Sequence, residues 1–171
     1  MMLNRGWVRR SALAALATLF FWAAPARAAE PAFMTFGAGA FDVNGDDTAT
    51  LLNFQYTDKR KWVWHLRPIT GAFVTHEGSL YGYAGLTMDI YFGPRLVLSP
   101  SFAPGLYLKN GGKELGHVVE FRSALSAAWR FDDRSRLGVD FSHISNAGLD
   151  ENNPGANQLM LFYSVPFSRG K

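Results

Sequence analysis

The chain has 171 residues, of which 17 are lysine or arginine and 14 are aspartate or glutamate, and it contains no cysteine. Disulfides and thiolate metal sites are therefore excluded. Four of the 17 basic residues lie before residue 29, so the remainder carries 13 basic and 14 acidic residues, a formal charge of −1. This balance gives no support for nucleic acid as a partner.

The first 28 residues predict a secretory signal peptide. A segment with three arginines is followed by an apolar stretch over residues 11–24 and by the small-x-small sequence Ala26-Arg27-Ala28, which is typical of a cleavage site. The apolar stretch is too short for a transmembrane helix. We expect cleavage after Ala28, export of the protein, and a single domain over residues 29–171.

Eight strand-like segments follow, each bounded by turn residues. Side chains of one parity share a face of a strand, and in most of these segments one parity is apolar while the other is polar. The expected strands are 33–43, 48–57, 62–74, 80–92, 95–108, 118–131, 137–145 and 157–167. The two longest loops between them cover residues 109–117 and 146–156.

This pattern predicts an all-β fold, an eight-stranded antiparallel transmembrane β-barrel of the outer-membrane type. An even number of strands with one apolar, aromatic face and one charged face is typical of such barrels. Trp62, Trp64 and Trp129 lie near expected strand ends, where membrane girdles of aromatic residues sit. The alternative is a soluble antiparallel barrel whose apolar face turns inward. If both termini are periplasmic, the two longest loops lie outside the cell.

In the membrane barrel the charged face points inward, and the interior of eight strands is filled by side chains rather than open. Five charged residues are expected to form a buried network there: Asp89, Glu120, Arg122, Arg130 and Asp140. Four other cations are expected on a solvated surface: Lys109, Lys113, Arg134 and Arg136. His65, His76 and His117 lack the spacing of metal ligands, and neither a metal nor another cofactor is expected.

Candidate catalytic residues come from the last two strands. The odd positions of 137–145 are apolar until His143 and Ser145, and the odd positions from Asn157 onward are again apolar. If the two strands pair as a hairpin, Asn157 lies beside the other two polar residues on the same apolar face. Serine, histidine and an orienting residue are the parts of a serine esterase. The oxyanion would be held by backbone N–H groups where the strand becomes a loop at Asn146, because Gly148 allows close approach there.

The string His143-Ile144-Ser145-Asn146-Ala147-Gly148-Leu149, with Leu161-Phe162-Tyr163, resembles the PagL-type lipid A 3-O-deacylases. Weaker similarity runs through 101–105 and 120–122. The resemblance implies a barrel in the bacterial outer membrane that acts on lipid A of lipopolysaccharide among membrane lipids. It implies Ser145 as nucleophile and His143 as general base, facing lipid. It also implies three residues near the oxyanion: Ala147, Gly148 and Asn153.

The chain departs from this family at one position, because Asn157 stands where the family has an acidic residue. An asparagine with this spacing is also found in outer-membrane phospholipase A, which is larger and has more strands. Asp150 or Glu151 in the loop could supply the acid instead. Three hypotheses follow: an esterase acting on lipid A, a phospholipase A, and a non-catalytic barrel serving as an adhesin or structural element with a degenerate triad. A homodimer is compatible with each of them.

Overall fold

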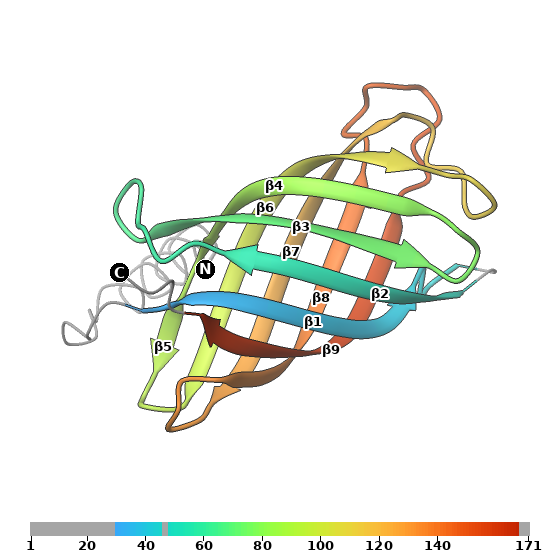
Figure 1. Cartoon of the computed structure of the whole chain (residues 1–171). Coiled ribbons are helices and arrows are strands. Elements are labelled where there is room, and N and C mark those ends of the chain that lie inside the picture. Colours follow the sequence, from blue (N-terminus) through green and yellow to red (C-terminus); the bar gives the residue numbers. More distant parts are fainter. Residues whose placement is uncertain (1–29, 46–47, 168–171) are drawn as a thin grey trace, which may run out of the picture.

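The computed structural model describes residues 30–45 and 48–167, and the predicted signal peptide lies outside the described residues. The chain forms a barrel of antiparallel strands (Figure 1). The strands are β1 (Ala32–Phe41), β2 (Ala49–Thr57), β3 (Leu66–Thr75), β4 (Leu80–Met88), β5 (Ile90–Phe92), β6 (Leu96–Leu108), β7 (Val119–Arg130), β8 (Arg136–Ser145) and β9 (Ala156–Phe167).

Each strand pairs with its neighbours in sequence, and β1 pairs with β9 to close the sheet. The short β5 continues β4 after a break at Asp89, and both pair with β6, so the barrel has eight strands. The predicted fold class is therefore confirmed. Within residues 30–45 and 48–167, no helix has the length and hydropathy needed to cross a membrane.

The two ends of the barrel differ. The chain enters β1 and leaves β9 at one end, called here the terminal end (Figure 1). The opposite end, called the loop end, carries the two longest connections, which cover residues 109–118 and 146–155. The connection after β1 and the connection after β3 lie at the loop end as well.

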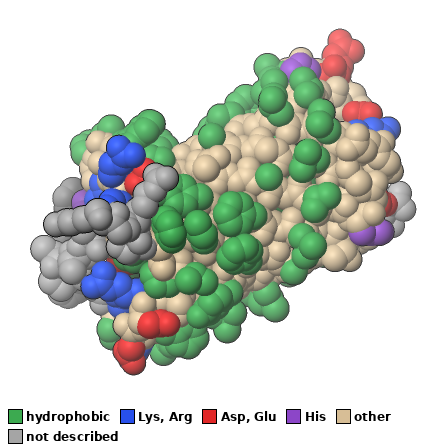
Figure 2. Space-filling view, in the orientation of Figure 1, with side chains coloured by type: hydrophobic (Ala, Val, Ile, Leu, Met, Phe, Trp, Pro, Cys, Tyr) green, Lys and Arg blue, Asp and Glu red, His purple; other side chains and the backbone are tan. Residues whose placement is uncertain are grey.

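The wall has apolar side chains outside and polar ones inside. On β7, Leu125 and Trp129 are 51% and 52% exposed, while Glu120 and Arg122 are buried. Charged side chains gather at the two ends of the barrel, and hydrophobic side chains cover much of the wall between them (Figure 2). A soluble barrel would bury the apolar face, so that alternative is wrong, and the arrangement is that of a membrane barrel.

One expected strand begins later than predicted. The segment 62–74 was expected to be extended throughout, but β3 starts at Leu66. Residues 58–65 form a turn at the terminal end, in which the Leu66 N–H donates to the Val63 carbonyl at 3.0 Å. Trp64 has a φ of 54°, which ends the extended conformation, and its side chain is 89% exposed.

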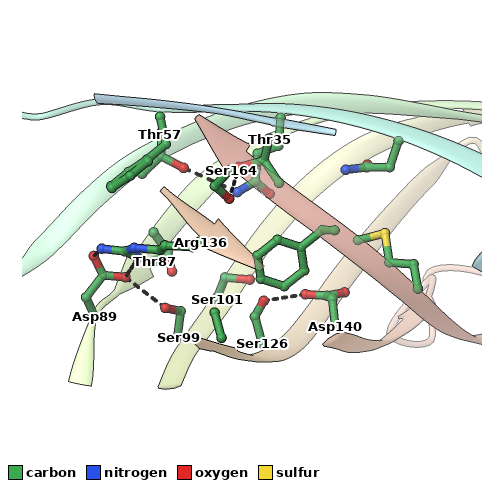
Figure 3. Close-up of a pocket in the computed structure, with 16 residues that line it drawn as sticks. Thr35, Thr57, Thr87, Asp89, Ser99, Ser101, Ser126, Arg136, Asp140 and Ser164 are labelled. Carbon is green, nitrogen blue, oxygen red and sulfur yellow. Dashed lines mark hydrogen bonds and ion pairs between the residues drawn. The ribbon is translucent and has the colours of Figure 1, made fainter. Parts of the chain in front are cut away.

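The terminal half of the interior holds the expected charge network. Arg67 and Arg136 donate to the Asp89 carboxylate at 2.7 and 2.9 Å. Figure 3 shows the contact between Arg136 and Asp89. Arg122 donates to Asp140 at 2.5 Å. Ser126 also donates to Asp140, at 2.5 Å, and Ser99 donates to Asp89 at 2.8 Å. A cavity of about 50 Å³ in the barrel is lined by five of these residues: Asp89, Ser99, Ser126, Arg136 and Asp140.

The predicted network is confirmed for Asp89, Arg122 and Asp140. Arg130 lies 3.9 Å from the carboxylate of Glu30. The carboxylate of Glu120 is buried, and within the part of the chain that the structure describes no cation pairs with it, so the prediction that it joins the network is wrong. The reason is its position on β7, opposite Gly105 and beside Tyr81, nearer the loop end than the paired charges.

The prediction that Arg136 lies on a solvated surface is wrong. Its side chain points into the barrel, where its guanidinium contacts Asp89 and lies 4.3 Å from the centre of the Phe33 ring. The reason is strand parity, because Arg136 shares its face of β8 with the inward Asp140. A buried arginine needs anionic and aromatic partners of this kind.

The loop half of the interior is apolar and aromatic instead. Its residues, called here the apolar layer, come from strand ends and from the loop after β6: Phe41, Phe73, Tyr81, Tyr107, Leu115, Ile144 and Ala156. Stacked and tilted ring pairs join them, such as Phe41 with Tyr107 at 6.3 Å between centroids. This layer gives the loop end a packed interior rather than an opening.

The buried pair of Arg122 and Asp140 gives a first prediction. Arg122→Met leaves the Asp140 charge without its cation, which should lower the free energy of unfolding by about 3–5 kcal/mol. Urea unfolding in detergent micelles, followed by tryptophan fluorescence, measures this loss. The double variant Arg122→Met/Asp140→Leu removes both charges and should recover most of the lost stability. A double variant no more stable than the single one would contradict this account.

Candidate active site

The end of β8 turns two polar side chains to the outside of the barrel. Ile144 is fully buried in the apolar layer, so its neighbours His143 and Ser145 point outward. The imidazole is exposed and the serine is half-buried. They share this outer face with Val139 and Phe141, which are both exposed. The outward placement predicted for the two residues is therefore confirmed.

Asn157 lies directly across from His143. The two residues are register partners in the pairing of β8 with β9. The Asn157 Oδ1 and the His143 Nδ1 are 2.8 Å apart. An amide oxygen only accepts, so Nδ1 carries the hydrogen and Nε2 has a free lone pair. The arrangement leaves Nε2 able to take a proton.

The Ser145 hydroxyl is near this imidazole but not bonded to it. Among residues 30–45 and 48–167, no hydrogen bond joins Ser145 to His143. The two are i and i+2 neighbours on one face of β8, so rotation about side-chain bonds can bring hydroxyl and imidazole together. Hydrogen bonds of this kind are often long in the absence of substrate.

An apolar surface surrounds these polar groups on the wall. Phe121 is the register partner of Ser145 on β7, and its ring stacks on Phe102 with centroids 6.0 Å apart. Across the site, Leu159 and Leu161 of β9 are exposed. A hydrocarbon chain lying along the wall would meet aromatic and aliphatic side chains on both sides of Ser145.

Asn146 organises the loop that follows. It is fully buried, and its Nδ2 donates to the carbonyls of Leu115 at 3.2 Å and of Asn152 at 2.9 Å. Its Oδ1 accepts from the Gly148 N–H at 2.9 Å, and its own N–H donates to Asn153 Oδ1 at 3.0 Å. One side chain thus ties the loop after β8 to the loop after β6.

These hydrogen bonds separate the four residues expected near the oxyanion into two whose N–H groups are already engaged and two that keep donors available. The N–H groups of Asn146 and Gly148 are engaged within the loop. Asn153 is held through its oxygen, which leaves its Nδ2 donors. Within the described part of the chain, the Ala147 N–H donates to no acceptor. Ala147 and Gly148 have φ values of 55° and 82°, so the backbone turns sharply just after Ser145.

The loop after β6 contributes to this arrangement, and no role was predicted for it from the sequence. Gly116 has a φ of 91°, and a Cβ at this position would collide with the Asn152 carbonyl. The Gly116 N–H donates to Glu114 at 3.1 Å, and this bond together with the Lys109 ammonium lowers the pKa of Glu114 below its ordinary value. Glycine is therefore required where the two loops touch.

The two acidic residues of the loop after β8 are exposed. Asp150 accepts from the Asn152 N–H at 2.8 Å within its own loop, and the hydrogen bond to the His143 ring is made by Asn157. In the described part of the chain, no group of three or more histidine, aspartate or glutamate side chains could hold a metal ion.

Sequence comparison gives a family match. A sequence model of the lipid A 3-O-deacylase (PagL) family matches residues 49–166. The lipid A deacylase PagL of Pseudomonas aeruginosa is 36% identical over 56 residues, which are 33% of this chain and 32% of that protein. The lipid A deacylase PagL of Bordetella bronchiseptica is 33% identical over 55 residues, 32% of this chain and 31% of that protein. The alignments thus span about a third of each relative.

Structural comparison supports the fold. The crystal structure of the outer membrane enzyme PagL superposes with a TM-score of 0.62 and 19% identity, covering 79% of this chain and 99% of that one. A de novo designed transmembrane β-barrel superposes with a TM-score of 0.57 and 10% identity, covering 81% and 98% of the two chains. Both share the barrel architecture.

Gly155 gives a second prediction. It has a φ of 61°, and a Cβ there would lie 2.9 Å from Cε1 of His143. Gly155→Ala should push the imidazole away from Asn157 and shift the His143 ring signals in ¹⁵N-histidine NMR spectra. Gly93→Ala is the matched control, because Gly93 has a φ of 67° with nothing within 4 Å of an added Cβ. Unchanged His143 signals in Gly155→Ala would contradict this packing.

Proposed function

Because the chain belongs to the lipid A 3-O-deacylase (PagL) family, we propose that it hydrolyses the ester that links an acyl chain to the 3 position of lipid A. The protein is a bacterial outer-membrane β-barrel. We propose further that residues 1–28 are its cleaved signal peptide and that the loop end faces the cell exterior, where lipopolysaccharide forms the outer leaflet.

One observation carries this proposal: the 2.8 Å contact between His143 Nδ1 and Asn157 Oδ1 on the apolar outer wall, two residues from Ser145. Two polar side chains on an apolar wall gain from bonding each other, so the contact matters here for the nitrogen it engages: it places the acceptor on Nδ1 and leaves Nε2 free for Ser145. A general base needs an acceptor at this nitrogen, because only the tautomer with a free Nε2 can accept the serine proton.

The reaction follows from these groups. His143 Nε2 takes the proton of the Ser145 hydroxyl as Oγ attacks the ester carbonyl. The tetrahedral intermediate collapses, the C–O bond to the sugar breaks, and the imidazolium returns the proton to the leaving sugar hydroxyl. Water then attacks the acyl-serine with His143 again as base, which releases the fatty acid and restores Ser145.

The oxyanion is stabilised by donors of the loop after β8. Ala147 N–H and Asn153 Nδ2 are two donors near Ser145 that the described loop does not use internally. Gly148 gives the chain the positive φ that lets the backbone turn close to the reacting carbon. Asn146 acts as a positioning residue, since its bonds hold both Asn153 and Gly148 in place.

Asn157 supplies orientation without charge. It accepts the Nδ1 hydrogen as a carboxylate would, but it adds no anion to stabilise the imidazolium that forms during attack. A working but slower triad is the expected consequence. The asparagine favours a second candidate, a phospholipase A acting on glycerophospholipid, because the known enzyme of that class uses asparagine as third member.

Ser145→Ala tests the function directly. The purified full chain in detergent micelles is incubated separately with lipopolysaccharide and with phosphatidylethanolamine, and released fatty acid is measured by mass spectrometry. We expect fatty acid release from lipopolysaccharide and at least a 1,000-fold loss of it in Ser145→Ala, because the nucleophile is removed. Product from phospholipid alone would establish the second candidate, and product from neither would establish a non-catalytic barrel.

Asn157→Asp tests the third member. The carboxylate keeps the length of the side chain and adds the missing charge, so kcat should rise about tenfold. The same anion stabilises the imidazolium. A base must be unprotonated, so the acid limb of the pH profile of kcat/KM should move to higher pH. Asn157→Leu should lower kcat by roughly 100-fold, and equal rates for Asn157→Leu and wild type would contradict the role of Asn157.

A further inference from the structure

Asn157 has a second partner that the triad does not account for. While Oδ1 faces His143, the Nδ2 of Asn157 donates to Oδ1 of Asn44 at 3.2 Å. The Val43 N–H also donates to the Asn157 backbone carbonyl at 3.0 Å. Asn44 belongs to the connection after β1, 113 residues away in sequence. This connection thus contacts both the backbone and the side chain of Asn157.

The second contact matters because an amide, unlike a carboxylate, has two different ends. With Oδ1 toward the imidazole, Nδ1 carries the hydrogen and Nε2 is free. With the amide reversed, Nδ2 would donate to Nδ1 and the hydrogen would move to Nε2, which could not then accept the serine proton. With its own Oδ1 turned toward Asn157, as in the structure, Asn44 accepts only when the Asn157 amide is in the productive orientation.

The connection that carries Asn44 is held in place by its own contacts. Asp42 is buried with a φ of 59°, and its carbonyl accepts from the Gly45 N–H at 3.0 Å. Its carboxylate binds the Lys113 ammonium at 2.6 Å, which joins it to the loop after β6. The Thr48 hydroxyl also donates to the Asp42 carbonyl, at 3.2 Å. Asn44 is therefore presented by a turn fixed at both ends.

We propose that Asn44 is a positioning residue for the reaction, which selects the orientation of the Asn157 amide and through it the tautomer of His143. The proposal rests on the function proposed above. It adds a fourth member: hydrogen bonds link Asn44 to Asn157 and Asn157 to His143, whose Nε2 would take the proton of Ser145. A carboxylate at position 157 would make this selection unnecessary, because its two oxygens are equivalent.

The first experiment compares Asn44→Ala with wild type, using the purified full chain in detergent micelles with lipopolysaccharide. Loss of one hydrogen bond to the amide should lower kcat about fivefold with KM changed by less than roughly twofold. Asn110→Ala is the control, because Asn110 is also exposed at the loop end and donates to a neighbouring loop at Gly78, but does not contact Asn157. It should leave kcat unchanged.

A double-mutant cycle separates orientation from general support of the loop. In the Asn157→Asp background, Asn44→Ala should change kcat by less than about twofold, because a carboxylate has no orientation to select. An equal loss in both backgrounds would show that Asn44 only supports the turn, and would overturn the proposal.

The conservative variant Asn44→Asp keeps an acceptor opposite Nδ2 and should retain wild-type kcat or exceed it. Its charge should also move the acid limb of the kcat/KM profile to higher pH, because a nearby anion favours the imidazolium. In Asn44→Asp/Asn157→Asp two carboxylates face each other, and kcat should fall below that of Asn157→Asp alone. Loss of activity in Asn44→Asp equal to that in Asn44→Ala would overturn the proposal.

Spectroscopy gives a readout that does not depend on the substrate. In ¹⁵N-histidine NMR spectra, wild-type His143 should show a protonated Nδ1, and Asn44→Ala should show a mixture of both tautomers. A single unchanged tautomer overturns the role of Asn44 even if the chain has no activity on lipopolysaccharide. Fatty acid release by Ser145→Ala equal to wild type would instead overturn the proposed function, so the two failures are distinguishable.

Discussion

The alternation of side chains along β8 is the constraint on which the site depends. Ile144 is fixed inside the apolar layer, and a strand cannot turn one residue inward without turning its two neighbours outward. His143 and Ser145 are therefore committed to the outer wall by a residue that takes no part in any chemistry. A shift of the strand register by one residue would bury the imidazole among aromatic rings and leave Ile144 facing outward. The packing that fixes Ile144 inside therefore also fixes the site on the outside.

The two halves of the barrel have interiors of different chemical character. In the terminal half, charged and hydroxyl side chains pair with one another around Asp89 and Asp140, which makes a polar interior tolerable without an open channel. In the loop half, aromatic rings and Leu115 fill the same space with apolar atoms. The site lies on the outside of this second half. A packed layer of aromatic rings holds the strand ends that carry the site more rigidly than a hydrated interior would. The proposed triad needs this rigidity, because its side chains must keep their relative positions.

Strand parity and local spacing predicted much of this from the sequence. Parity placed Glu120 and Arg122 inside, and the hairpin argument placed Asn157 beside His143. What the sequence did not show are contacts made only when the barrel closes. Asn44 lies 113 residues from Asn157, and Asn146 reaches Leu115 in another loop. Neither contact belongs to a periodic pattern. The glycine-rich sequence of the loop after β6 was a signal of close approach there, but it did not identify the partner.

The asparagine in the proposed triad changes what the rest of the site must provide. A carboxylate contributes charge and presents two equivalent oxygens, so the imidazole finds an acceptor whichever way the group turns. An amide contributes no net charge and presents an acceptor on one side only. A group outside the proposed triad must therefore orient the Asn157 amide. In the structure the Oδ1 of Asn44 accepts from this amide, and Asn44 lies on a turn held by the ion pair between Asp42 and Lys113. Replacing an acid by an amide at position 157 would by itself leave the tautomer of His143 undetermined. An asparagine at position 157 is compatible with general-base chemistry when the connection after β1 packs against β9 and orients its amide. Asn157, which departs from the family pattern, and the turn that carries Asn44 therefore depend on each other.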